Sequence, residues 1–122
     1  MIEERLSCII RPDALGNWSI QDDVDHHNNG FHSIAQTNDT LILTFLSTYD
    51  KAGTIQVSAD DDFAGLFELG GNLSLSDSRL KLRLPGVGTV INPSQIWRSR
   101  AGLTPGSGNF WINATMWRNP PA

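Results

Sequence analysis

Apolar and polar residues alternate with a period of two along most of this chain, and the 3.6-residue period of an amphipathic helix is hard to find. In the first such run, LSCII, the apolar face consists of Leu6, Cys8 and Ile10. In the last, FWINATMW, one face consists of Phe110, Ile112, Ala114 and Met116, and the other of Trp111, Asn113, Thr115 and Trp117. Because successive side chains of a strand point to opposite faces of a sheet, both runs predict strands with one buried face.

Between these two runs the same alternation predicts further short strands. They cover residues 17–21, 31–37, 40–49, 54–59, 72–76, 79–84 and 87–91, and residues 94–100 form another strand or a loop. Turns are predicted where Asn, Asp, Gly and Pro gather, at residues 38–39, 50–53, 70–71 and 85–88. A short helical turn, capped by Asp60 or Asp61, is predicted over residues 60–69.

The parity of three segments predicts which side chains face the core. In residues 31–37, Phe31, Ser33 and Ala35 lie opposite His32, Ile34 and Gln36. Farther along, Leu73, Leu75, Leu80, Leu82 and Leu84 are all expected to point inward. Residues 40–49 are apolar on both faces, with Leu41, Leu43 and Phe45 on one side and Ile42, Thr44 and Leu46 on the other. This pattern predicts a central strand, covered on one side by the core and on the other by a neighbour or a partner chain.

About eight to ten short strands, spaced by roughly 8 to 12 residues with turn residues between them, are typical of a sandwich or barrel. The chain has 122 residues, which is the length of one ordinary domain. No internal repeat, low-complexity tract or interdomain linker divides it. We therefore expect residues 1–122 to form a single all-β domain, an antiparallel β-sandwich or a jelly-roll-like fold.

Composition narrows the classes of partner. The formal net charge is −4 and the nine basic residues are scattered except for Arg79, Lys81 and Arg83, so nucleic-acid binding is disfavoured. The single cysteine, Cys8, allows no intrachain disulfide and is expected to be a buried thiol. No run approaches the roughly 20 apolar residues of a membrane helix, and we expect a soluble chain without a cleaved leader.

The segment most suggestive of chemistry is DDVDHHNNG, residues 22–30, with His32 just beyond it. Adjacent residues of an extended segment point in opposite directions, so His26 and His27 are poorly placed to share a zinc or iron ion. Calcium is conceivable because the segment is rich in oxygen donors, although its spacing differs from that of an EF-hand. The interpretation that needs the fewest assumptions is that this segment is a polar connection between two strands. A cation site and a catalytic site are the alternatives.

A second acidic cluster, residues 60–62, is expected to be a solvated cap, with a cation as the alternative. No G-x-S-x-G motif is present, no pair of carboxylates is singled out for glycoside cleavage, and the GxG fragments do not precede a helix. We therefore expect no enzyme activity, no catalytic residue, no metal ligand and no cofactor.

The tryptophans are the most informative candidates for binding. Four occur in the chain, and Trp97, Trp111 and Trp117 fall in its last quarter. By parity, Trp111 and Trp117 share the face of the final strand that lies opposite Phe110. This face is a second core surface, a subunit interface or a platform for stacking sugars.

The order of Trp18, Asp22-Asp23, His26 and Gly30, then an apolar strand, Tyr49, Asp60-Asp61 and a final strand ending in Trp, resembles small β-rich virion proteins of tailed bacteriophages. The shared pattern is a loose W-x-x-x-D-D-x-x-H-x-x-x-G. The resemblance implies a sandwich or jelly-roll module that assembles, often as a trimer, on a capsid, tail or fibre. It also implies that residues 1–7 could act as an anchoring arm.

From these observations we expect a non-enzymatic structural protein of a tailed-phage virion, made in the bacterial cytoplasm. Its expected partners are further copies of itself in a homotrimer, other virion proteins and a host-surface glycan or receptor. The two-sided strand 40–49 and the Trp111/Trp117 face would supply the association energy. The alternative function is a carbohydrate-binding module that uses Trp97, Trp111 or Trp117.

Overall fold

Nine β-strands and no helix make up the secondary structure of residues 1–13, 17–37, 40–59, 68–84, 88–89 and 108–121, the parts of the chain that the computed structural model describes. The strands are β1 (Ile2–Pro12), β2 (Trp18–Gln21), β3 (Phe31–Thr37), β4 (Thr40–Phe45), β5 (Lys51–Ala59), β6 (Glu68–Leu73), β7 (Asp77–Leu84), β8 (Gly88–Thr89) and β9 (Phe110–Arg118). The predicted strands over 17–21, 31–37 and 79–84 are therefore confirmed to within a few residues.

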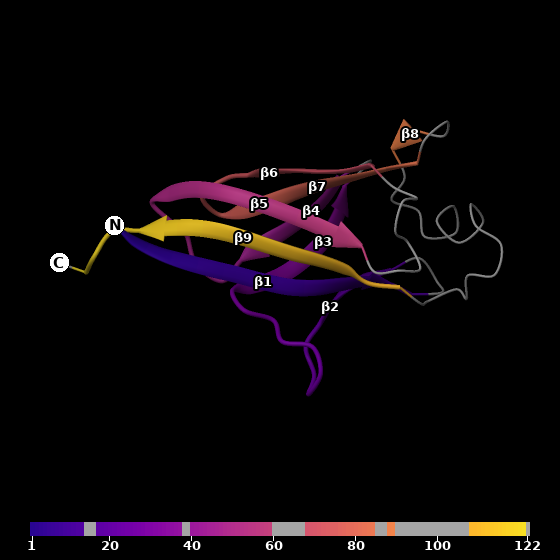
Figure 1. The fold of residues 1–122 in the computed structure, drawn as a ribbon, viewed down its shortest axis with the longest axis horizontal. Helices are drawn as coiled ribbons and strands as arrows, with labels where there is room; N and C mark the ends of the chain where they lie inside the picture. Colours follow the sequence, from indigo (N-terminus) through magenta and orange to yellow (C-terminus); the bar gives the residue numbers. More distant parts are fainter. Residues whose placement is uncertain (14–16, 38–39, 60–67, 85–87, 90–107, 122) are drawn as a thin grey trace.

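The strands form two antiparallel sheets packed face to face (Figure 1). Sheet A has the order β2-β1-β9-β5, and sheet B has the order β3-β4-β7-β6, with the two-residue β8 paired to β7. The first and last strands, β1 and β9, are neighbours in the middle of sheet A, so the two ends of the chain lie side by side (Figure 1). The predicted all-β sandwich is confirmed.

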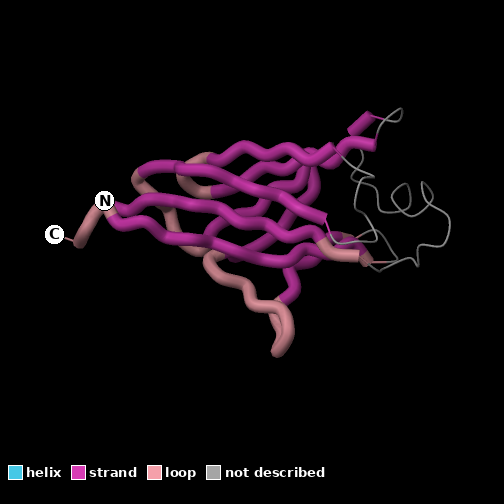
Figure 2. The backbone as a smooth tube through the Cα atoms, in the orientation of Figure 1, coloured by secondary structure: helices cyan, strands magenta, loops and turns pink. Residues whose placement is uncertain are grey.

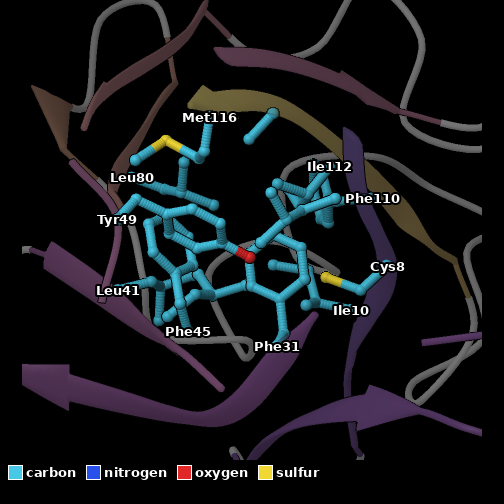
Figure 3. Packing of buried hydrophobic residues seen from close by; sticks show 13 residues of the cluster. Cys8, Ile10, Phe31, Leu41, Phe45, Tyr49, Leu80, Phe110, Ile112 and Met116 are labelled. Atoms are coloured by element: carbon cyan, nitrogen blue, oxygen red, sulfur yellow. The ribbon is translucent and has the colours of Figure 1, made fainter. Parts of the chain in front are cut away.

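The core lies between the two sheets, where the alternating apolar residues of both meet. Figure 3 shows these side chains pointing toward one another between the strands. They are Leu6, Cys8, Ile10, Phe31, Leu41, Leu43, Phe45, Tyr49, Leu80, Phe110, Ile112, Ala114 and Met116. The inward faces predicted for the first and last strands are thus confirmed. The rings of Phe31 and Tyr49 each meet Phe45 edge to face, with centroids 5.6 and 5.8 Å apart.

Strand β3 differs from its predicted parity because its register against β4 shifts between Phe31 and Ser33. Such a bulge inserts one extra residue and moves the following side chains to the other face. Phe31 is buried, as expected, but beyond the bulge it is Ile34 that packs against the core, while Ser33 and Ala35 are exposed. The prediction that Phe31, Ser33 and Ala35 share a face is therefore wrong.

Strand β4 is central in sheet B, between β3 and β7, as predicted, but it ends at Phe45 and not at residue 49. Its outer face is only half-buried and includes Ile42, which lies beside Arg79 of β7. The chain then turns, and Leu46 is exposed. Strand β4 therefore contributes little exposed apolar surface with which to bind a partner chain.

Two turn predictions and one inward-facing position are corrected by the structure. Strand β5 already begins at Lys51, so the turn lies before residue 51 and not over 50–53. Gly70 and Gly71 lie inside β6 and do not end a helical turn. Leu75 was expected to point inward but lies in the turn between β6 and β7, where it is exposed. Of the predicted helical turn over 60–69, only residues 68–69 are described, and they belong to β6; Asp60 to Asp62 lie outside the described residues.

Ser78 is a polar exception in the core, since it is fully buried and its hydroxyl has no hydrogen-bond partner in the described structure. A buried hydroxyl without a partner costs desolvation free energy that no contact returns. We expect Ser78→Ala to raise the free energy of unfolding by about 1 kcal/mol. Urea denaturation of both proteins would measure this. A loss of stability would show that the hydroxyl does have a partner.

Candidate functional site

The DDVDHHNNG segment is the connection that leaves sheet A at the end of β2 and enters sheet B at β3, and it projects from the sandwich as a loop (Figure 2). At its tip, Asp23 Oδ1 accepts hydrogen bonds from the backbone N–H groups of Asp25 and His26, each at 2.9 Å. The same oxygen lies 2.8 Å from Nδ1 of His26. The hydrogen bond to His26, followed by that to Asp25, lowers the pKa of the Asp23 carboxyl below its ordinary value.

The second half of the loop is fastened to the sandwich by the amides of Asn28 and Asn29. The Asn28 side chain donates to the carbonyl of Phe31 at 2.6 Å and accepts from its N–H at 3.2 Å. Asn29 pairs with Ser7 of β1 through two backbone hydrogen bonds of 2.8 and 3.0 Å. Its side-chain Nδ2 also donates to the carbonyl of Arg5 at 2.8 Å. The loop thus lies against the edge of β1.

Gly30 completes this connection at a position where only glycine fits well. Its φ is +96°, in the region that side chains disfavour, and a Cβ there would lie 2.7 Å from Cδ2 of Leu6 in the core. Among the described residues, no group of three or more His, Cys, Asp or Glu side chains could hold a metal ion. The side chains of Asp23, His26, Asn28 and Asn29 form hydrogen bonds within the loop and to the neighbouring strands, which supports the interpretation as a polar connection.

Among the described residues, Trp111 is the most exposed large aromatic side chain, with 47% of its area exposed on the outer face of sheet A. In the sheet register Trp111 lies between Ile9 of β1 and Ser58 of β5. The next row of the same face contains Asn113 between Ser7 and Gln56. We call Ser7, Ile9, Gln56, Ser58, Trp111 and Asn113 the Trp111 strip. It is uncharged, and all six side chains are exposed or half-buried.

Trp117 lies on the same face as Trp111, as the parity predicts, but it is only half-buried and has charged neighbours. It stands between Glu3 of β1 and Lys51 of β5 in the register. Its Nε1 would lie 3.2 Å from a Cβ at Gly53, so the indole lies beside a glycine of the β5 bulge. The two tryptophans therefore differ in surroundings. Trp97 lies outside the described residues.

A cluster that the sequence pattern did not single out closes the end of the core near the chain termini. Arg118 Nε donates to Glu4 Oε1 at 2.9 Å, and the Arg118 guanidinium lies 4.7 Å from the centroid of the Tyr49 ring. Glu4 and Arg118 continue the inward-facing rows of Leu6 and Met116, and this parity is the signal that could have revealed them. The hydrogen bond from Arg118, and then that from Tyr49, lowers the pKa of the Glu4 carboxyl.

The ion pair between Glu4 and Arg118 makes the free energy of unfolding depend on pH in the acid range. A carboxyl whose pKa is lower in the folded than in the unfolded chain stabilises the fold above its ordinary value of 4.5, and this contribution is lost as the pH falls through the folded value. We expect Glu4→Gln to flatten the loss of stability between about pH 5 and pH 3. Thermal unfolding over this range would measure it. Parallel curves for the two proteins would contradict the prediction.

Cys8 is the remaining candidate nucleophile in the described structure. It is buried in the core, and desolvation raises the pKa of its thiol to about 12. Because the thiolate is the reactive form, these surroundings disfavour reactivity, and the prediction that Cys8 is a buried thiol is confirmed.

No protein-family model, no curated protein and no solved structure matches this chain. Among the described residues there is also no helix with the length and apolar character needed to span a membrane. The function is therefore inferred from the faces and edges of the two sheets.

Proposed function

We propose that this domain is a non-enzymatic structural module of a tailed-phage virion, which assembles into a homo-oligomer through the outer face of sheet A. The observation that supports assembly is the Trp111 strip, an uncharged surface on the two central strands and β5 with a half-exposed indole in it. The resemblance of the Trp18, Asp22-Asp23, His26 and Gly30 pattern to phage virion proteins supports the particle as its setting. The hydrogen bonds that Asp23, His26, Asn28 and Asn29 make within the loop and to the neighbouring strands support a structural role for this segment.

Sheet A is favoured over sheet B because of charge. The outer face of sheet B carries Asp77, Arg79 and Lys81, and its apolar Ile42 is half-buried beside Arg79. The centres of protein interfaces are depleted of charged residues and enriched in tryptophan. An interface of standard size covers about 800 Å² of each partner. The uncharged Trp111 strip would form the centre of such an interface at a low desolvation cost, and the charged Glu3, Arg5 and Lys51 of the same face would form its rim.

A carbohydrate-binding module is the second candidate, and one observation favours it. The amides of Asn113 and Gln56 and the hydroxyl of Ser58 are neighbours of Trp111 in the register of sheet A. An exposed indole with neighbouring amides can stack on a sugar ring and hydrogen-bond its hydroxyls. The ligand at this face would then be a neutral glycan on the host surface and not a second copy of the chain.

The test compares Trp111→Ser with Leu75→Ser, a control that removes a side chain of similar exposure, 45%, from a turn in the other sheet. We expect the wild type to be an oligomer by multi-angle light scattering. Trp111→Ser should weaken self-association by about 30-fold or more, as for an interface hot spot. Leu75→Ser should leave self-association unchanged, and circular dichroism should show both variants folded.

Quenching of tryptophan fluorescence gives an independent readout. Dissociation of the wild-type oligomer should increase quenching by acrylamide, because Trp111 becomes accessible. A wild type that remains monomeric at about 100 µM would overturn the assembly proposal, since standard interfaces bind more tightly than this. Binding of a monomer to a neutral glycan array, lost in Trp111→Ser, would establish the carbohydrate function instead.

A further inference from the structure

The N-terminal half of β1 is an open edge of sheet A. Strand β2 pairs only with Ile9–Pro12, and Asn29 forms a single bridge to Ser7. No described strand lies beside residues 2–6 on the side away from β9 (Figure 1). An open edge presents unpaired backbone groups that can hydrogen-bond another strand.

The register identifies which backbone groups point outward along this edge. Ser7 directs both its N–H and its carbonyl to Asn29, so the residues in step with it, Glu3 and Arg5, also direct theirs away from β9. The Arg5 carbonyl already accepts from Nδ2 of Asn29 at 2.8 Å, and a carbonyl oxygen has a second lone pair. The edge therefore offers a short ladder, bounded at its far end by the loop that holds Asn29.

The charges on this edge are self-complementary. Glu3 and Arg5 lie on the outer face, with 41% and 84% of their side chains exposed, and their charged atoms are 4.0 Å apart. In an antiparallel pairing of two copies centred on Glu4, Glu3 of each copy lies opposite Arg5 of the other. The Glu4 carboxylates, which then face each other across the axis, are already neutralised by Arg118. A shift of the centre by one residue places Glu3 opposite Glu3 or Arg5 opposite Arg5, which is unfavourable.

We propose that two copies of this chain pair antiparallel along Ile2–Leu6 of β1, with a twofold axis at Glu4. This inference rests on the self-association proposed above and identifies one partner as a second copy joined edge to edge. The pairing fuses the two A sheets into one continuous sheet. Because the axis is perpendicular to that sheet, both Trp111 strips face the same side. The assembly then contains an even number of copies.

Charge reversal tests the pairing, with sedimentation equilibrium as the readout. Glu3→Arg should weaken self-association by about tenfold, because both cross-strand pairs become repulsive. The double variant Glu3→Arg/Arg5→Glu should restore the wild-type association constant to within about threefold, because the opposite-charge pairs reform. The matched control is Arg79→Glu, a charge reversal at an exposed position on the outer face of sheet B, away from both proposed surfaces, which should have no effect.

A backbone test uses Glu3→Pro. Proline removes an N–H that points away from β9, so the ladder between β1 and β9 stays intact while edge pairing is blocked. We expect a folded protein, by circular dichroism and thermal unfolding, that no longer pairs. A strictly trimeric wild type, or failure of the double variant to restore association, would overturn the edge pairing. If Trp111→Ser dissociates the oligomer and the Glu3 variants do not, the oligomer forms through the outer face of sheet A alone. If the Glu3 variants dissociate it and Trp111→Ser does not, the oligomer forms through the β1 edge alone.

Discussion

Phe110→Ala should lower the free energy of unfolding by about 3 to 5 kcal/mol, the largest effect expected of any single substitution in this domain. The Phe110 side chain is fully buried at the start of β9, where its backbone pairs with Ile10 on one side and Ala59 on the other. Its ring lies 5.8 Å from that of Trp18. Truncation would leave a cavity beside Trp18 at the start of β9, since β1 and β5 on either side hold the backbone of β9 in place.

Urea unfolding followed by circular dichroism would measure this loss, with Asn113→Ala as the control on the exposed face of the same strand. We expect the control to change stability by less than about 0.5 kcal/mol. A loss below about 1 kcal/mol for Phe110→Ala would mean that the site collapses around the smaller side chain, and that the aromatic contact with Trp18 adds little.

The second large effect is expected for Gly53→Ala, about 1 to 3 kcal/mol of destabilisation from overpacking. Gly53 lies in the bulge where the register of β5 against β9 shifts between Ala52 and Ile55. A Cβ there would collide with the carbonyl oxygen of Thr115, a backbone atom that cannot move without disturbing the pairing of the strands. The indole of Trp117 would also have to shift.

Gly70→Ala is the matched control, because a Cβ at Gly70 meets nothing within 4 Å. Gly70 is exposed on the edge strand β6, and we expect the substitution to be neutral or to stabilise by up to about 1 kcal/mol by restricting the unfolded chain. Equal losses at the two glycines would show that intrinsic strand propensity, and not the close approach at the bulge, determines the effect.

Residues with strict alternation were predicted correctly from the sequence. Leu6, Cys8 and Ile10, and the row from Phe110 to Met116, are buried because one face of each strand must leave water, and a period of two identifies that face. Strands β2 and β7 were predicted correctly for the same reason. The class of fold then follows from the number of such strands and the turn residues between them.

The errors occurred where the backbone departs from a regular pleat. The bulges in β3 and β5 each insert one extra residue. In β3 the extra residue reverses the parity of Ser33 and Ala35. In β5 the bulge includes Gly53, which therefore lies in a strand and not in the predicted turn. Glycine usually weakens a strand, so Gly70 and Gly71 predict a turn. At the edge of sheet B, however, their pairing with β7 keeps them extended.

The candidate site was predictable only in part. Parity placed Trp111 and Trp117 on one face, but not their unequal exposure, which depends on Ile9 and Ser58 beside one and on the β5 bulge beside the other. Parity can place Glu4 and Arg118 on the inward faces of their strands, but it does not predict that they pair, because the pairing depends on which two strands become neighbours. That choice is made by residues about a hundred positions apart.

The adjacency of β1 and β9 also shapes how the chain must be made. Strand β9 is the common neighbour of β1 and β5, so during translation both wait for a segment that leaves the ribosome about fifty to a hundred residues later. Until then β5 has no neighbour within sheet A, and β1 has only β2, at its C-terminal end. We therefore expect nascent chains that stop before Phe110 to need a chaperone, and sheet A to be completed only once the closing strand has emerged.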